Sequence, residues 1–64
     1  MDKLSNSYRR YANAADARAE KWLAMLKKMT DKDSKMVCAR QYRRCKADAR
    51  ESRKKAEEYA KMGI

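Results

Sequence analysis

The five residues TDKDS at positions 30–34 separate two runs of regularly spaced residues, and this break decides the fold. In both runs the steps alternate between three and four residues, which is the seven-residue repeat of packed helices. The first run is Leu4, Tyr8, Tyr11, Ala15, Arg18, Trp22, Met25 and Met29. The second run is Cys38, Tyr42, Cys45, Ala49, Ser52, Ala56 and Tyr59. Extending the first repeat does not lead into the second, so the phase changes at the break.

This change of phase predicts a turn at residues 30–34 between two helices, at about residues 4–29 and 34–61. Asp33 or Ser34 is expected to cap the second helix, and a glycine at position 63 suits its end. The chain has no proline and one glycine, and good helix formers dominate it, so we expect an all-α fold. One continuous helix is the alternative, because TDKDS contains no true helix breaker.

Residues 1–64 are therefore expected to form a single domain, an antiparallel two-helix hairpin with a heptad seam. Pairing Met29 with Cys38 fixes a register in which partner numbers sum to 67, so that Tyr8 faces Tyr59. In this register large side chains mostly face small ones, as interdigitated packing requires. One seam between two helices is a thin core, and a chain of this length is marginal as a lone monomer.

The apolar face of the first helix is wider than one partner helix can cover. The residues that widen it are Ala12, Ala19, Leu23 and Leu26. We expect them to mediate self-association, with two hairpins forming a four-helix bundle or a higher oligomer.

Eighteen basic and nine acidic residues give a formal net charge of +9, spread over both helices. On each helix the cations gather on one flank, whereas a merely solvated helix alternates the two signs. The residues expected to bind anions are Arg10 and Lys21 on the first helix and Arg43, Lys46, Arg50, Arg53 and Lys54 on the second. In an antiparallel pair the two basic flanks are expected on opposite faces of the monomer.

These flanks predict a protein that binds a phosphate-rich anion, with nucleic acid as the expected partner. Arginine suits phosphate through its two-pronged geometry. The alternatives left open are a solvated surface without a ligand, capture of a small cyclic nucleotide between subunits, and a phage-type inhibitor or adaptor that docks on an acidic protein. The aromatic residues fall on the seam, so core packing is expected of them rather than base stacking.

The two cysteines, Cys38 and Cys45, lie seven residues apart on the second helix. Helical rise separates them by about 10.5 Å, which is beyond the reach of a disulfide. The sequence contains no histidine, so one chain does not supply a four-coordinate zinc site. We expect both thiols to act as small apolar filler in a reducing compartment, with an intermolecular disulfide or a site shared between chains as the alternatives.

Neither catalysis, nor a cofactor, nor a resident metal is expected from this sequence. There is no Gly-rich phosphate loop and no clustered acids, and a hairpin of this size offers no enclosed pocket. No stretch approaches the roughly 18 apolar residues of a membrane span, and the start lacks the apolar core of a signal peptide. We therefore expect a soluble, cytoplasmic protein.

The chain is short, and its acidic turn DKD at 31–33 is closely followed by Val37 and Cys38. In these features the layout resembles that of the Rop family of plasmid copy-number regulators. The resemblance implies a short helical hairpin that dimerises into a four-helix bundle and binds paired RNA loops. The chain is far more basic than that family, and no functional residue is carried over from it.

Overall fold

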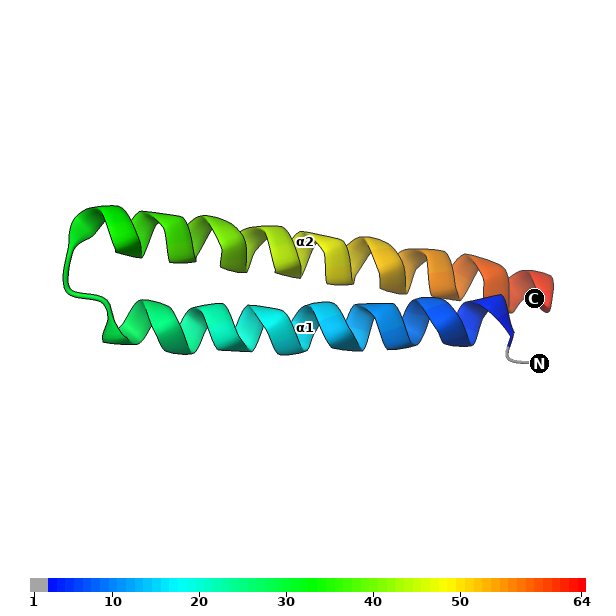
Figure 1. Cartoon of the computed structure of the whole chain (residues 1–64). Coiled ribbons are helices and arrows are strands. Elements are labelled where there is room, and N and C mark those ends of the chain that lie inside the picture. The colour runs from blue at the N-terminus through cyan, green and yellow to red at the C-terminus, as the bar shows by residue number, and fades with distance from the viewer. Residues whose placement is uncertain (1–2) are drawn as a thin grey trace.

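The computed structural model describes residues 3–64, which form two long helices folded back on each other as an antiparallel hairpin (Figure 1). Helix α1 covers Leu4–Lys28 and helix α2 covers Lys32–Met62. The hairpin is a rod with extents of 48 × 16 × 11 Å, with the turn at one end and the start of α1 and the end of α2 at the other. This part of the chain contains no strand, and neither helix combines the length and hydropathy needed to cross a membrane. The predicted all-α hairpin is confirmed.

Helix α2 presents its predicted stripe to α1. Every member of that stripe is buried or half-buried, namely Cys38, Tyr42, Cys45, Ala49, Ser52, Ala56 and Tyr59. The rings of Tyr8 and Tyr59 stack with their centroids 5.3 Å apart. The predicted register, in which these two residues face each other, is therefore confirmed at the open end of the hairpin.

Helix α1 is rotated relative to the prediction. Tyr11 is 67% exposed, and Leu4, Arg18 and Met25 are also exposed, so the prediction that these four residues lie on the seam is wrong. The buried and half-buried residues that form the repeat toward α2 are Ser5, Tyr8, Ala12, Ala15, Ala19, Trp22 and Leu26 of α1 and its C-cap Met29, with Leu23 half-buried beside them. This stripe keeps the seven-residue repeat but takes the step of four where the prediction took the step of three.

Small side chains explain the choice of stripe. The most buried apolar positions are Ala12, Ala15, Ala19, Ala49 and Ala56, each at most 1% exposed, and Cys38 at 3%. Alanine lets two helix backbones approach closely without leaving voids. The observed phase also leaves the charge of Arg18 in water, where the desolvation cost of burying an unpaired ion is avoided.

The residues predicted to mediate self-association lie elsewhere than expected. Ala12 and Ala19 are 0% exposed inside the seam, so the prediction that they lie beyond what the partner helix covers is wrong. Leu23 and Leu26 are half-buried. All four residues therefore belong to the side of α1 that packs on α2, because the seam itself uses the alanines.

The turn is shorter than predicted, and α2 begins at Lys32 because Asp31, rather than Asp33 or Ser34, is its N-cap. The Asp31 carboxylate accepts a hydrogen bond from the backbone N–H of Ser34 at 3.0 Å. This backbone hydrogen bond is the main cause that holds the pKa of Asp31 below its ordinary value. A carboxylate at this position satisfies one of the helix's orphan donors and interacts favourably with its dipole.

Gly63 ends α2, as predicted, with φ of 79° in the left-handed region. The N–H of Gly63 donates to the carbonyl of Ala60 at 3.1 Å, and the N–H of Ile64 donates to that of Tyr59 at 3.0 Å. These two bonds form a Schellman motif, which satisfies the last carbonyls of the helix. Glycine suits the position because it adopts positive φ without steric cost.

A backbone hydrogen bond joins the first turn of α1 to the residue that follows Gly63. The N–H of Ser5, a residue only 3% exposed, donates to the carbonyl oxygen of Ile64 at 3.1 Å. Helix α1 has no side-chain cap at Lys3, so its first turn lacks the usual acceptor. The end of α2 supplies that acceptor instead.

Candidate anion-binding site

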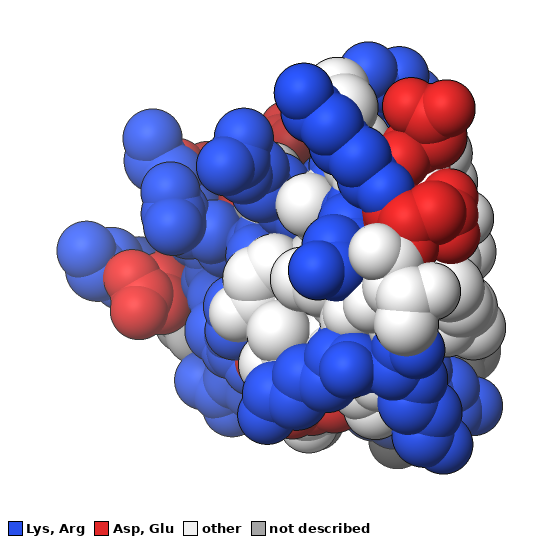
Figure 2. Space-filling model, turned by 90° about the vertical axis from the view of Figure 1, so that its left-hand side faces the viewer, with Lys and Arg blue, Asp and Glu red and all other residues white. Residues whose placement is uncertain are grey.

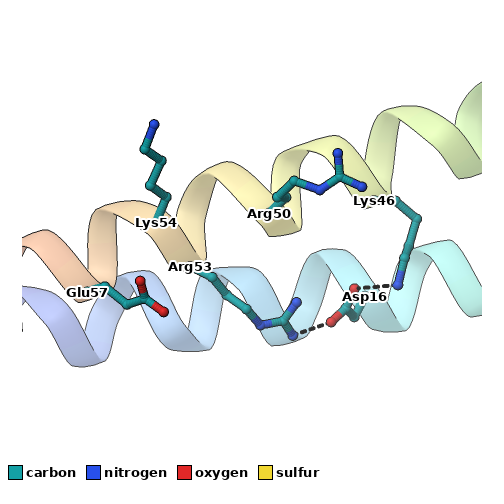
Figure 3. A pocket seen from close by; sticks show the side chains of 6 residues that line it. All are labelled: Asp16, Lys46, Arg50, Arg53, Lys54 and Glu57. Atoms are coloured by element: carbon teal, nitrogen blue, oxygen red, sulfur yellow. Dashed lines mark hydrogen bonds and ion pairs between the residues drawn. The ribbon is translucent and has the colours of Figure 1, made fainter.

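One flank of the hairpin carries a shallow, open hollow of about 420 Å³, which we call the cationic groove (Figure 3). It is lined by Asp16, Lys46, Arg50, Arg53, Lys54 and Glu57. Four cations and two acids leave this groove with a net charge of +2. Asp16 comes from α1 and the other five residues come from α2.

The spacing along α2 brings these residues to one flank. Lys46 and Arg50 are four residues apart, Arg50 lies three and four residues before Arg53 and Lys54, and Glu57 lies four and three residues after them. On a helix, residues three or four apart lie above one another on the same flank. The seam residues Ala49 and Ala56 fix the direction in which this flank points, since both are buried against α1. The groove is therefore a direct consequence of the repeat that forms the seam.

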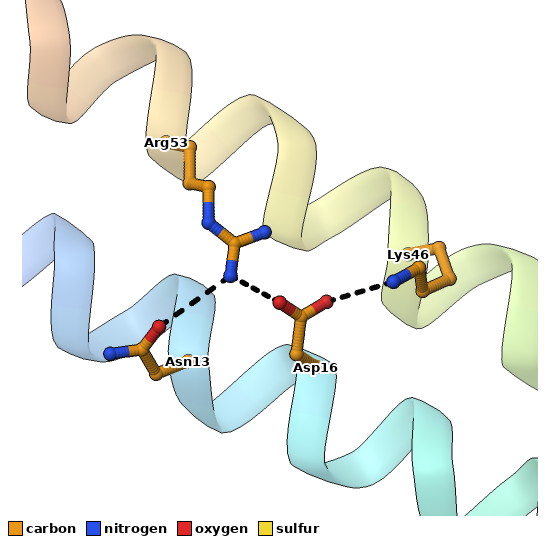
Figure 4. A network of polar contacts seen from close by, with 4 residues as sticks. All are labelled: Asn13, Asp16, Lys46 and Arg53. Atoms are coloured by element: carbon orange, nitrogen blue, oxygen red, sulfur yellow. Dashed lines mark hydrogen bonds and ion pairs between the residues drawn. The ribbon is translucent and has the colours of Figure 1, made fainter.

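Asp16 is the centre of the polar contacts between the helices (Figures 3 and 4). Its Oδ1 accepts a hydrogen bond from Lys46 Nζ at 3.3 Å, and its Oδ2 accepts one from the guanidinium of Arg53. Arg53 also donates to Oδ1 of Asn13 at 3.5 Å. The Arg53 hydrogen bond is the largest cause that holds the pKa of Asp16 below its ordinary value, so the carboxyl is ionised at neutral pH.

Arg50 and Lys54 differ from the other two cations of the groove. Both are exposed, and neither forms an ion pair with any residue in the described part of the chain. In Figure 3 the Lys54 side chain extends away from α1, whereas Lys46 and Arg53 reach down to Asp16. The groove thus offers two cations held by an internal acid and two cations directed to solvent.

Two smaller hollows lengthen the basic flank. One, of about 270 Å³, adjoins the groove through Arg53 and Glu57 and adds Arg9 and Asn13 from α1. The other, of about 290 Å³, lies nearer the turn and is lined by Met36, Ala39, Arg40 and Arg43. Arg43 precedes Arg50 by seven residues, about two helical turns, so both point to nearly the same side of α2.

Of the residues predicted to bind anions, the structure brings four together in the groove, namely Lys46, Arg50, Arg53 and Lys54. Arg43 lines a separate hollow on the same flank. Arg10 precedes the buried Ala19 by nine residues, and Lys21 follows the buried Ala12 by nine, which is about two and a half turns in each case. Both cations therefore lie on the side of α1 that faces away from α2, outside the groove.

Asp16, Glu57, Arg9 and Asn13 are site residues that the sequence did not single out. Glu57 lies on α2, within the basic flank itself. The positions of Arg9, Asn13 and Asp16 depend on the phase of α1, which the larger side chains of Tyr11 and Met25 obscure in the sequence. When Ala12, Ala15 and Ala19 are assigned to the seam, Asp16 directly follows a buried residue and borders the flank of α2 that carries the basic residues. That adjacency is the signal that would have found it.

Neither the cysteines nor the stacked tyrosines belong to the groove. Cys38 is buried and Cys45 half-buried, and both thiols are free. The ammonium of Lys55 lies 5.8 Å from the centre of the Tyr8 ring, within the range of a cation–π contact. These residues therefore contribute to the seam and its rim.

Positive charge is not restricted to the groove. Seen from the turn end, Lys and Arg side chains cover much of the top, left and bottom of the surface, whereas acidic and other side chains lie toward the right (Figure 2). The groove differs from the rest of this basic surface because it is hollowed and because an acid of the opposite helix organises two of its cations. No protein-family model, no curated protein and no solved structure matches the chain.

Proposed function

We propose that the protein binds the phosphate backbone of nucleic acid through the cationic groove. The observation that carries this proposal is the pair of exposed cations, Arg50 and Lys54, in a hollow that already holds Lys46 and Arg53. Basic side chains that converge on one hollow bind phosphate through charge-assisted hydrogen bonds, and arginine adds a two-pronged geometry. Binding of this kind is strongly dependent on salt.

The shape of the basic flank favours a chain of phosphates over a single small molecule. From Arg43 to Lys54 the cations extend over about 16 Å of helix α2. The hollows are shallow and open, whereas sites for small molecules enclose most of the ligand surface. The groove is lined by charged side chains alone, without an aromatic ring for base stacking, so recognition independent of sequence is expected.

The test compares two double variants in which the same charge is removed from different places. Arg50→Ala with Lys54→Ala removes the exposed pair of the groove, and Lys21→Ala with Lys28→Ala removes two exposed cations of α1 outside it. Binding to a fluorescein-labelled single-stranded RNA is followed by anisotropy between about 0.05 and 0.2 M salt. The groove variant is expected to bind more weakly and to flatten the salt slope by about 1.4, two phosphate contacts at about 0.7 each.

Two results would overturn the proposal. One is an equal loss of affinity in both double variants, which would show that only the net charge of the protein matters. The other is the absence of any binding to single-stranded or duplex nucleic acid at low salt. Binding of a cyclic nucleotide or of an acidic protein in place of RNA would assign the groove to one of the other predicted partners.

We also propose that two hairpins associate, as the Rop-like layout implies. The chain exposes 5226 Å², whereas a compact monomer of 7.5 kDa exposes about 4,200 Å². The excess of about 1,000 Å² is close to the roughly 800 Å² that each partner contributes to a standard interface. A second copy of the chain is the occupant that this area suits.

The surface that fits such a dimer is the exposed flank of α1 that bears Leu4, Tyr11 and Met25, which are 43%, 67% and 42% exposed. These residues are spaced by seven or fourteen, so they form one stripe, in which the exposed Arg18 lies between Tyr11 and Met25. Tyr11 lies about 140° around α1 from Asp16, five residues at 100° each, so a dimer through this stripe leaves the cationic groove open. The predicted interface of Ala12, Ala19, Leu23 and Leu26 is replaced by this stripe.

Sedimentation equilibrium tests the dimer. Tyr11→Lys with Met25→Lys is expected to convert a dimer into a monomer, because it places two charges in the stripe. Ala17→Lys with Ala24→Lys is the control, since both alanines are exposed on α1 outside the stripe. A wild-type mass of one chain, or an equal effect of both variants, would contradict the proposal.

A further inference from the structure

We infer that Asp16 limits the number of phosphates that the cationic groove binds, because it holds Lys46 and Arg53 while Arg50 and Lys54 receive the phosphates. The inference rests on the proposed binding of nucleic acid and names the residue that sets its strength. In this arrangement the chain carries its own competitor for the ligand.

The geometry of Asp16 supports this role. Each carboxylate oxygen is engaged by a different cation of α2, Oδ1 by Lys46 and Oδ2 by Arg53 (Figure 4). The Asp16 side chain is 27% exposed, whereas those of Lys46 and Arg53 are 42% and 48% exposed. The two cations therefore remain within reach of a ligand, but their charge already has a partner.

Charge balance explains why an incoming phosphate does not simply replace Asp16. A phosphodiester carries one negative charge, as does the carboxylate that it would displace, so the exchange adds no net attraction at Lys46 and Arg53. Arg50 and Lys54 involve no such exchange, because no acid of the described chain pairs with them. Two contacts with phosphates, from Arg50 and Lys54, are thus expected in the wild-type groove, although four cations line it.

Glu57 provides a matched comparison. It lines the same hollow and carries the same charge as Asp16, yet it forms no ion pair with any of residues 3–64. Asp16→Asn and Glu57→Gln each remove one negative charge from the groove and preserve the shape of the side chain. Asp16→Asn alone releases two cations, so the two variants separate the effect of release from that of net charge.

The experiment measures binding of the labelled single-stranded RNA by wild type and by both variants across a range of salt. Asp16→Asn is expected to bind about ten-fold more tightly or better, and to steepen the salt slope by about 1.4, because two further phosphate contacts form. Glu57→Gln is expected to change the affinity by less than about three-fold. Equal gains in both variants would overturn the inference, and so would weaker binding by a folded Asp16→Asn protein.

A second pair of variants keeps the inference testable if loss of Asp16 opens the hairpin. Lys46→Gln with Arg53→Gln removes the two cations that Asp16 holds, and Arg50→Gln with Lys54→Gln removes the two that it leaves exposed. The first pair is expected to weaken binding several-fold less than the second. Equal losses would show that all four cations contact the ligand equally, which contradicts a competing role for Asp16.

The two proposals fail in different ways. If wild type does not bind RNA and the Arg50 and Lys54 variants change nothing, the proposed function is wrong. If wild type binds through Arg50 and Lys54 but Asp16→Asn and Glu57→Gln are alike, only the inference about Asp16 is wrong. Circular dichroism and the urea midpoint of each variant establish that it is folded under the binding conditions.

Discussion

Tyr8 and Tyr59 stack across the hairpin, with their ring planes 23° from parallel and their centroids 5.3 Å apart. One ring comes from the second turn of α1 and the other from the last turns of α2, so the contact exists only in one antiparallel register. Both side chains are half-buried. The stack therefore holds the two helices together at the open end of a seam otherwise built largely from alanine.

A double-mutant cycle should detect the energetic coupling between Tyr8 and Tyr59. Replacing Tyr8 and Tyr59 by leucine, singly and together, keeps an apolar side chain at each position but removes the aromatic pair. We expect a coupling free energy of about 0.5–1.5 kcal/mol, the usual value for a stacked aromatic pair. Urea unfolding followed by circular dichroism measures it.

Tyr11 is the control for this cycle. It belongs to the stripe that the sequence predicted, yet it is 67% exposed. Tyr11→Leu should change the free energy of unfolding of the monomer by less than about 0.5 kcal/mol. At a protein concentration at which the chain is monomeric, a larger loss for Tyr11→Leu than for Tyr8→Leu would contradict the observed phase of α1.

The alanines of the seam should not tolerate larger side chains. Ala15 and Ala19 are 0% exposed, so a leucine at either position has to push the helices apart. Ala15→Leu or Ala19→Leu is expected to cost about 1–3 kcal/mol of unfolding free energy through overpacking. Ala17→Leu is the matched control on the exposed side of the same helix, and it should be nearly neutral. Stabilisation by Ala19→Leu would show that the helices lie further apart than the burial indicates.

Acid should weaken the hairpin below about pH 3.8. The pKa values of Asp16 and Asp31 both lie below their ordinary value of 3.8, through the hydrogen bond from Arg53 in one case and that from Ser34 in the other. A folded-state pKa that is lowered gives stability that is present above the unfolded value and is lost as pH falls through the folded one. Urea midpoints measured from neutral to acidic pH should therefore be level first and then decline.

Variants assign this decline to its sources. Asp31→Asn retains a capping oxygen for the N–H of Ser34 but cannot be protonated, so it should keep most of the stability and lose part of the acid dependence. Asp31→Ala should lower the urea midpoint at neutral pH, because the cap is absent. An acid profile identical to that of wild type in both Asp16→Asn and Asp31→Asn would contradict this account.

The sequence predicted the two helices, their register and the whole seam face of α2, because the repeat of α2 has one consistent phase. For α1 it offered two phases that share Tyr8, Ala15, Trp22 and Met29. Choosing the larger apolar residues led to Tyr11, although that phase also required the charged Arg18. Close packing decides between such phases, and the space available between two backbones is a property of the folded pair that a single helix does not reveal.

The groove was predicted in part for the same reason. The basic flank of α2 depends only on spacing within one helix, so Lys46, Arg50, Arg53 and Lys54 could be identified. Asp16 acts across the seam, so its role depends on the phase of α1. Cations counted along one helix say how much charge is present, whereas the opposite helix decides how much of that charge already has a partner.

The hydrogen bond from Ser5 to Ile64 has a consequence for the connectivity of the fold. The two helices are joined by the turn at one tip of the rod, and at the other tip this hydrogen bond holds the start of α1 beside the end of α2. The seam does not depend on which helix is made first. A short linker between the present ends and a new opening at residues 29–31 should preserve both helices and the cationic groove, as tolerated permutations generally place breaks in exposed loops. We therefore expect such a permuted chain, which starts at the opposite tip of the rod, to show the same helix content by circular dichroism as the natural order.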